Sequence, residues 1–87
     1  MPALKSIAAV FDCDGGKTVK AVFESGAQSL VKLALSDGRE LTLPQARSGS
    51  GARYADAKES FVFWNKGDTA FIEESGTTTY RGCNLRR

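Results

Sequence analysis

Apolar and polar residues alternate with a period of two along most of the chain, which is the pattern of strands with one buried face. Between the first alternating segments lie Asp14-Gly15-Gly16 and Asp37-Gly38, which predict turns, the second of them a tight hairpin. We expect Pro44 to end the fourth segment. The apolar faces of these four segments are formed by Ile7, Ala9, Phe11 and Cys13; by Val19, Ala21 and Phe23; by Val31, Leu33 and Leu35; and by Leu41 and Leu43.

The second half of the chain predicts four more strands. The segment Ser48-Gly49-Ser50-Gly51 predicts an exposed loop, because glycine loses more entropy on ordering than other residues do. Residues 52–60 include good helix formers, but the length is marginal for a helix, so we predict a strand over residues 53–55. Residues 61–64 are apolar on both faces and predict a central strand.

Turns are predicted at residues 65–68 and 75–76, and they bound strands over residues 69–73 and 77–82. The total is about eight short strands joined by tight turns. Eight antiparallel strands in so short a chain must pack as a small closed barrel or a sandwich. Closure of a barrel would remove sheet edges that otherwise pair with other chains.

The length of 87 residues supports one domain over residues 1–87, with a thin core. The chain has two cysteines, Cys13 and Cys83, and no histidine, so a metal site of paired ligands is disfavoured and a disulfide is favoured. Such a bridge would stabilise the fold by roughly 4 kcal/mol in the chain-entropy model. Two unrelated buried thiols are the alternative. A disulfide implies an oxidising compartment, and we then expect a signal sequence to have been removed, with Met1 an added start.

The charge balance disfavours several partners. Twelve basic and ten acidic residues give a formal net charge of +2, which is too little to imply a nucleic-acid or anionic-membrane partner. No apolar stretch has the length of a transmembrane helix, and we expect a soluble chain. Asp12 and Asp14 flank Cys13, yet two acids at a strand end make no metal site without further oxygen ligands. We expect no metal and no cofactor.

Two other function classes stay open at this point. Ser50 and Lys66 are the residue types of a serine–lysine hydrolytic dyad, but Lys66 precedes a polar turn where water would keep its ammonium charged. A small barrel could also bind single-stranded nucleic acid as OB-folds do, by stacking bases on aromatic rings. The candidate rings are those of Tyr54, Phe61, Phe63, Trp64 and Tyr80.

Two motifs give the chain a family resemblance. They are Ser48-Gly49-Ser50-Gly51-Ala52-Arg53-Tyr54 and Phe63-Trp64-Asn65-Lys66-Gly67-Asp68-Thr69-Ala70, with Phe11-Asp12-Cys13 before them and Cys83 after them. With these motifs the chain resembles the membrane-bound and periplasmic inhibitors of c-type lysozyme. The resemblance implies an eight-stranded antiparallel barrel, a Gram-negative envelope location, a role in defence against host lysozyme, and no enzymatic activity.

The resemblance also implies a lysozyme-binding site. Ser50 and Lys66 are the residues expected to reach the catalytic acids of the target, and Gly49, Gly51 and Gly67 are expected to let the backbone approach it. Lysozyme works with one protonated and one ionised carboxyl group, so a hydroxyl and an ammonium delivered together would satisfy both. Arg53 either flanks this interface or pairs with a local acid. Tyr54 and Trp64 are expected to be packing supports.

Two further expectations concern anchoring and the spacing between the motifs. No lipobox cysteine precedes the domain, so a membrane anchor is expected only if the natural form carries a lipid. The spacing between the motifs, through residues 56–60, can vary among relatives. The sequence also leaves a homodimer open.

Overall fold

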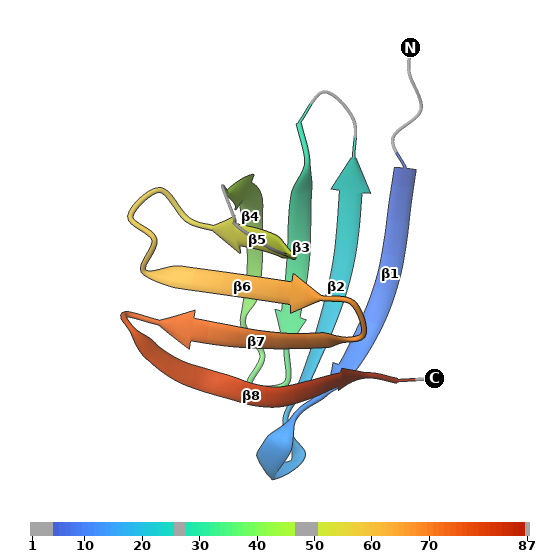
Figure 1. Cartoon of the computed structure of the whole chain (residues 1–87), viewed down its shortest axis with the longest axis vertical. Helices are drawn as coiled ribbons and strands as arrows, with labels where there is room; N and C mark the ends of the chain where they lie inside the picture. The colour runs from blue at the N-terminus through green and yellow to red at the C-terminus, as the bar shows by residue number, and fades with distance from the viewer. Residues whose placement is uncertain (1–4, 26–27, 47–50, 87) are drawn as a thin grey trace.

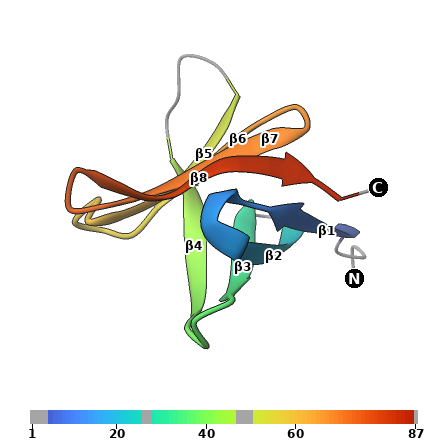
Figure 2. The same ribbon diagram turned by 90° about the horizontal axis from the view of Figure 1, so that it is seen from below.

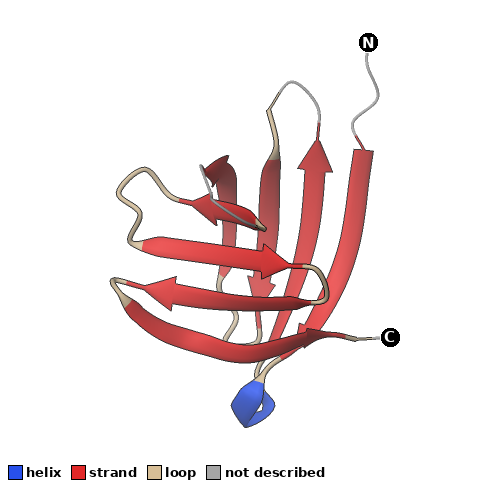
Figure 3. Cartoon of the chain, viewed as in Figure 1, coloured by secondary structure: helices blue, strands red, loops and turns tan. Residues whose placement is uncertain are grey.

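A computed structural model describes residues 5–25, 28–46 and 51–86, and within them eight strands form a closed antiparallel barrel (Figures 1 and 3). Each strand pairs with the next one along the chain, and the last pairs with the first. The all-β, eight-stranded barrel is therefore confirmed. The strands are β1 (Lys5–Asp12), β2 (Thr18–Ser25), β3 (Leu30–Leu35), β4 (Glu40–Ala46), β5 (Ala52–Ala55), β6 (Phe61–Lys66), β7 (Thr69–Glu74) and β8 (Thr77–Leu85), with a short 3₁₀ turn, η1 (Asp14–Gly16), after β1.

The barrel is flattened into two layers that cross. In Figure 1, β1 to β4 run nearly vertically and β6 to β8 run across them, and Figure 2 shows β6 to β8 as one layer over β1 to β3. Strands that cross at a large angle are the orthogonal type of sheet packing. The side chains between the two layers form the core.

The core confirms the period-two pattern in β3, but the expectation is wrong at the start of β1, where Ile7 is 65% exposed. In β3 the residues alternate between buried and exposed, with Val31, Leu33 and Leu35 inside. Phe63 of β6 is fully buried at the centre, and its ring centroid lies 6.1 Å from those of Phe11 and Phe23. Because aromatic rings bury large areas and pack edge to face, this cluster joins the two layers.

The barrel closes where its first and last strands meet. β1 pairs with β8 only at Phe11 and Asp12, and directly after this short ladder a disulfide joins Cys13 to Cys83 with an S–S distance of 2.04 Å. Arg86 adds a hydrogen bond of 3.0 Å from its Nε to Asp12. The predicted disulfide is confirmed, and it supports a seam where only two residue pairs join the strands.

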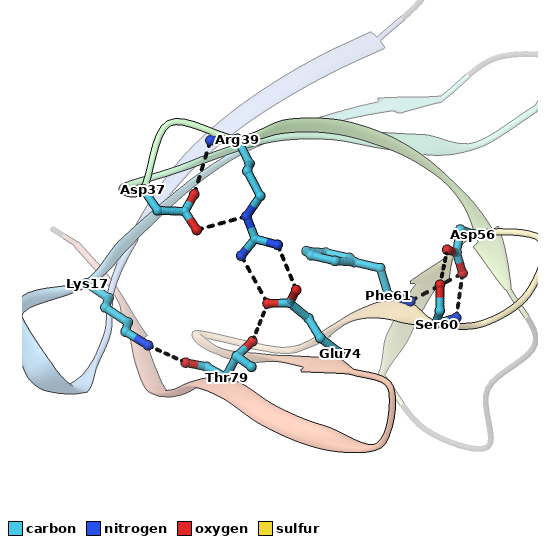
Figure 4. Close-up of polar contacts among 8 residues, drawn as sticks. All are labelled: Lys17, Asp37, Arg39, Asp56, Ser60, Phe61, Glu74 and Thr79. Carbon is cyan, nitrogen blue, oxygen red and sulfur yellow. Dashed lines mark hydrogen bonds and ion pairs between the residues drawn. The ribbon is translucent and has the colours of Figure 1, made fainter.

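A polar cluster links the residue just before β4 to β7 and β8, at the end of β4 that does not pair with β5. Arg39 donates from Nε to Asp37 (2.8 Å) and from Nη1 and Nη2 to both oxygens of Glu74 (2.7 and 3.0 Å) (Figure 4). Thr79 Oγ1 also donates to Glu74 (2.7 Å), and Lys17 Nζ donates to the Thr79 carbonyl (2.7 Å). This Arg39 cluster ties the β3–β4 hairpin to β7 and β8.

The expectation that Pro44 ends its strand is wrong, because β4 continues to Ala46. Pro44 stands opposite Leu30 of β3, and the next N–H, that of Gln45, donates to the Ser29 carbonyl (3.0 Å). Backbone N–H groups point alternately to the two sides of a strand, so an N–H at position 44 would point away from β3. On that side β4 pairs with β5, and this pairing begins only at Gln45. A proline there removes no ladder hydrogen bond.

The expectation that the last strand ends at Gly82 is also wrong, because β8 runs to Leu85. Ala70 pairs with Cys83 and Ile72 with Tyr80, so two residues of β8 stand opposite one of β7. Gly82 has a φ of +62°, and a β-carbon on it would lie 2.5 Å from an oxygen of Asp14. The glycine therefore marks a β-bulge inside the strand and not its end.

Candidate functional site

The two sequence motifs meet at one edge of the barrel, because β5 and β6 pair antiparallel. Ala52 stands opposite Asn65, and Arg53 stands opposite Trp64. This register places Gly51, just before β5, beside Lys66 at the end of β6. Gly51, Lys66 and Gly67 are all exposed there. Gly49 and Ser50, which complete the predicted lysozyme-binding set, lie outside the described residues.

The turn that carries Lys66 is held by side-chain hydrogen bonds. Asn65 Nδ2 donates to the carbonyls of Gly67 (3.2 Å) and Thr69 (2.9 Å). Thr69 Oγ1 donates to the Lys66 carbonyl (2.9 Å). The Asp68 carbonyl accepts from the Leu85 N–H (2.7 Å), so all four carbonyls of residues 66–69 have partners and the backbone at Lys66 has a defined direction. Its ammonium makes no ion pair with any residue that the structure describes.

A stack of side chains on the outer face supports this edge. Arg53, Trp64 and Phe71 follow one another across β5, β6 and β7 in register. The guanidinium of Arg53 lies 5.7 Å from the Trp64 ring centroid, and the rings of Trp64 and Phe71 are stacked with centroids 5.9 Å apart. Cross-strand pairs of this kind and cation–π contacts each stabilise a sheet surface. We refer to these three residues as the Trp64 stack.

Arg53 also forms an ion pair with Glu59, and its side chain is only 17% exposed. The structure therefore shows Arg53 paired with a local acid, which is one of the two roles expected for it. Tyr54 is buried in the core, where its ring centroid lies 6.3 Å from that of Phe63.

Sequence reasoning missed Phe71. The signal that was available is that Trp64 and Phe71 both fall on the outward positions of their strands.

The nucleic-acid alternative loses its stacking surface. Four of its five proposed rings, those of Tyr54, Phe61, Phe63 and Tyr80, are at most 7% exposed. The fifth ring, that of Trp64, already stacks on Phe71. Bases need exposed ring faces to stack on, so these aromatic residues serve the fold.

No group of three or more histidine, cysteine, aspartate or glutamate side chains is placed to hold a metal ion in the described part of the chain. Asp12 is paired with Arg86, and the hydrogen bond from that arginine lowers the pKa of the carboxyl group. A shallow groove of about 510 Å³ lies over β7 and β8 beside Phe71, but neither Gly51 nor Lys66 lines it. Among the described residues no helix has the length and apolar character to cross a membrane.

Comparison with known proteins places the chain in a family. The family model described as "Membrane-bound lysozyme-inhibitor of c-type lysozyme" matches residues 11–80. A Yersinia enterocolitica protein named "Membrane-bound lysozyme inhibitor of C-type lysozyme" is 41% identical over 75 residues, which are 86% of this chain and 60% of that protein. An Escherichia coli K12 protein of the same name is 40% identical over 50 residues, 58% of this chain and 44% of that protein. The chain thus spans about half the length of these relatives.

A solved structure supports the same assignment. The crystal structure of Pseudomonas aeruginosa MliC in complex with hen egg white lysozyme superposes with a TM-score of 0.77 at 26% sequence identity, and the match covers 99% of this chain and 90% of that one. The residues matched by the family model, 11–80, include both sequence motifs. The chain therefore belongs to the family of membrane-bound lysozyme inhibitors of c-type lysozyme.

Proposed function

We propose that this chain inhibits c-type lysozymes by placing the loop at Ser50 and the turn at Lys66 in the catalytic cleft. The observation that carries the proposal is the pairing of Ala52 with Asn65, which brings the two family motifs to one edge of the barrel. The solved relative, which has the same fold, is bound to hen egg white lysozyme. Both observations support a binding protein whose site is an exposed edge.

The chemistry of the edge fits the chemistry of the target. A c-type lysozyme uses one carboxyl group as the acid and keeps a second one ionised. The Lys66 ammonium is a compact charge on a flexible stem, so it can enter a narrow cleft and pair with the ionised group. The Ser50 hydroxyl can donate or accept a hydrogen bond there. Since Lys66 has no ion pair with a described residue, its binding to a carboxylate would break no such pair in the inhibitor.

The remaining elements of the proposal follow from this role. The chain would act as a binding partner and not as an enzyme, with Gly49 and Gly67 in the loop backbone that approaches lysozyme. A disulfide-closed barrel suits an oxidising compartment, which agrees with a periplasmic or outer-membrane-anchored location. The residues 1–87 would form one inhibitory domain.

A cell-wall clearing assay tests the proposed function. Purified protein is titrated against a c-type lysozyme acting on a bacterial cell-wall suspension, with a goose-type muramidase as the control enzyme. We expect near-stoichiometric inhibition of the c-type enzyme and a weaker effect on the control, because the shape of its cleft differs. Undiminished clearing by the c-type enzyme in a large molar excess of this protein would reject the proposal.

A further inference from the structure

Gly51 lies in unusually close contact with the second motif. Its φ is +69°, and a β-carbon built on it would lie 2.6 Å from Lys66 Cγ, 2.7 Å from the Asn65 backbone oxygen and 3.3 Å from Trp64 Nε1. Two of these distances are shorter than any that real β-carbons show, so no residue with a side chain fits here without a shift. A side chain at position 51 would therefore be directed at residues of the second motif and not at solvent.

Among the other described glycines only Gly82 shares this feature, with a β-carbon position 2.5 Å from an oxygen of Asp14, and the remaining ones differ. Gly67 (φ +56°) and Gly76 (φ +84°) also have the left-handed backbone, but a β-carbon on either of them would meet nothing within 4 Å. At those two positions glycine satisfies the backbone conformation alone. At Gly51 it satisfies the conformation and also permits a close approach between two segments.

The contact joins the parts of the proposed site. Gly51 directly follows Ser50 in the chain, and the atom nearest to the position that its β-carbon would occupy belongs to the aliphatic stem of Lys66. The Asn65 side chain holds the Lys66 turn, and the Trp64 stack holds the indole beside Gly51. A lysine stem that is packed on a fixed backbone has fewer rotamers to lose on binding, and such preorganisation increases affinity.

We infer that Gly51 is a positioning residue of the inhibitory site: its lack of a side chain lets the backbone just before β5 pack against the Lys66 stem and the Trp64 indole, and this contact sets the direction in which the Lys66 ammonium projects. The inference rests on the proposed function and deepens it. It gives Gly51 a task inside the inhibitor, whereas Gly67 remains a candidate for close approach to lysozyme.

The test compares Gly51→Ala with Gly76→Ala. Both variants put a β-carbon on a left-handed backbone, so both lose stability through the same strain, but only the first collides with Lys66. We expect the dissociation constant for c-type lysozyme to rise by about tenfold or more in Gly51→Ala, mainly through faster dissociation. Binding by Gly76→Ala should equal that of the unaltered chain.

A second measurement needs no lysozyme. Trp64 is the single tryptophan of the chain, so its fluorescence reports on the contact in the free protein. We expect acrylamide to quench Trp64 more strongly in Gly51→Ala than in Gly76→Ala, because displacing the backbone at residue 51 would uncover the indole nitrogen beside it. Equal quenching together with equal affinities in the two variants would overturn the role of Gly51.

A third variant covers the case in which Gly51→Ala folds poorly. Lys66→Ala removes Cγ, the atom nearest to the added methyl group, so Gly51→Ala should lower the melting temperature less in that background than in the unaltered chain. An equal loss in both backgrounds would contradict the contact with Lys66. If the unaltered chain does not inhibit lysozyme, the proposed function fails; if it inhibits no better than Gly51→Ala does, only the role of Gly51 fails.

Discussion

The charge and the stem of Lys66 can be tested separately, because the structure assigns them different contacts. The ammonium pairs with no described residue, while the stem lies against Gly51. Lys66→Met keeps most of the stem and removes the charge, and Lys66→Ala removes both. If the ammonium faces a buried carboxylate of lysozyme, losing it should weaken binding by about 2–4 kcal/mol, which is roughly a 30- to 700-fold rise in the dissociation constant.

Both variants should therefore bind weakly. Lys66→Ala should bind more weakly than Lys66→Met, and the difference between these two should be smaller than the difference between Lys66→Met and the unaltered chain. Lys66→Arg should not restore binding, because the planar guanidinium is bulkier than an ammonium in a narrow cleft. Affinities from calorimetry or surface binding measure these effects, and the melting temperature of each free variant should change little because the side chain is exposed. The matched controls are Lys20→Ala and Lys32→Ala, which remove the same charge from exposed strand positions. Equal weakening in all three alanine variants would show that diffuse electrostatics, and not insertion of Lys66, holds the complex.

Three further predictions follow from the same geometry. Ser50→Ala should weaken binding by about 1–2 kcal/mol through the loss of one hydrogen bond, and a double variant with Lys66→Ala should depart from additivity by at least about 0.5 kcal/mol in a binding cycle; strict additivity would mean that the two side chains do not share a target. Replacing both cysteines with serine should lower the melting temperature, by an amount equivalent to roughly 4 kcal/mol, and an unchanged melting curve would contradict a stabilising bridge. The hydrogen bond from Arg39 lowers the pKa of Glu74 below its ordinary value of 4.5, so this pair stabilises the fold above that pH and loses its effect as the carboxylate is protonated in acid. Melting temperatures measured from neutral pH down to pH 3 should fall less steeply for Glu74→Gln than for the unaltered chain, and parallel curves would exclude the pair as a source of acid sensitivity.

The strand pattern could be predicted because alternation within one segment indicates which side chains face inward. The disulfide could be predicted because the other uses of two cysteines were disfavoured. Alternation along residues 30–35 by itself indicates which side chains face inward, and the structure buries Val31, Leu33 and Leu35 as expected. With two cysteines and no histidine, a disulfide was the favoured pairing, and the closure of the barrel brings Cys13 and Cys83 together. These features depend on residue type and spacing alone.

Features that depend on register between strands could not be predicted in the same way. Pro44 and Gly82 are strand-ending residues in general, yet each lies inside a strand because of what stands opposite it. The Trp64 stack requires Arg53, Trp64 and Phe71 to be neighbours on three strands, and sequence alone does not give that alignment. Likewise, the contact between Gly51 and Lys66 exists only because β5 and β6 pair in one particular register.

Strand register also bears on the proposed role of this small barrel, because register determines which residues of the two motifs are neighbours before lysozyme binds. An inhibitor that fills a catalytic cleft needs a projecting edge whose shape is set before binding, because every side chain ordered in the complex subtracts from affinity. Here the Asn65 hydrogen bonds fix the turn, the Trp64 stack fixes the outer face, and the disulfide fixes the seam of the sheet that carries both. The two motifs are separated in sequence by the β5–β6 connection, yet the antiparallel pairing of β5 with β6 places the described end of the first motif beside the second. A change that loosens this pairing should therefore weaken inhibition even where it leaves Ser50 and Lys66 in place.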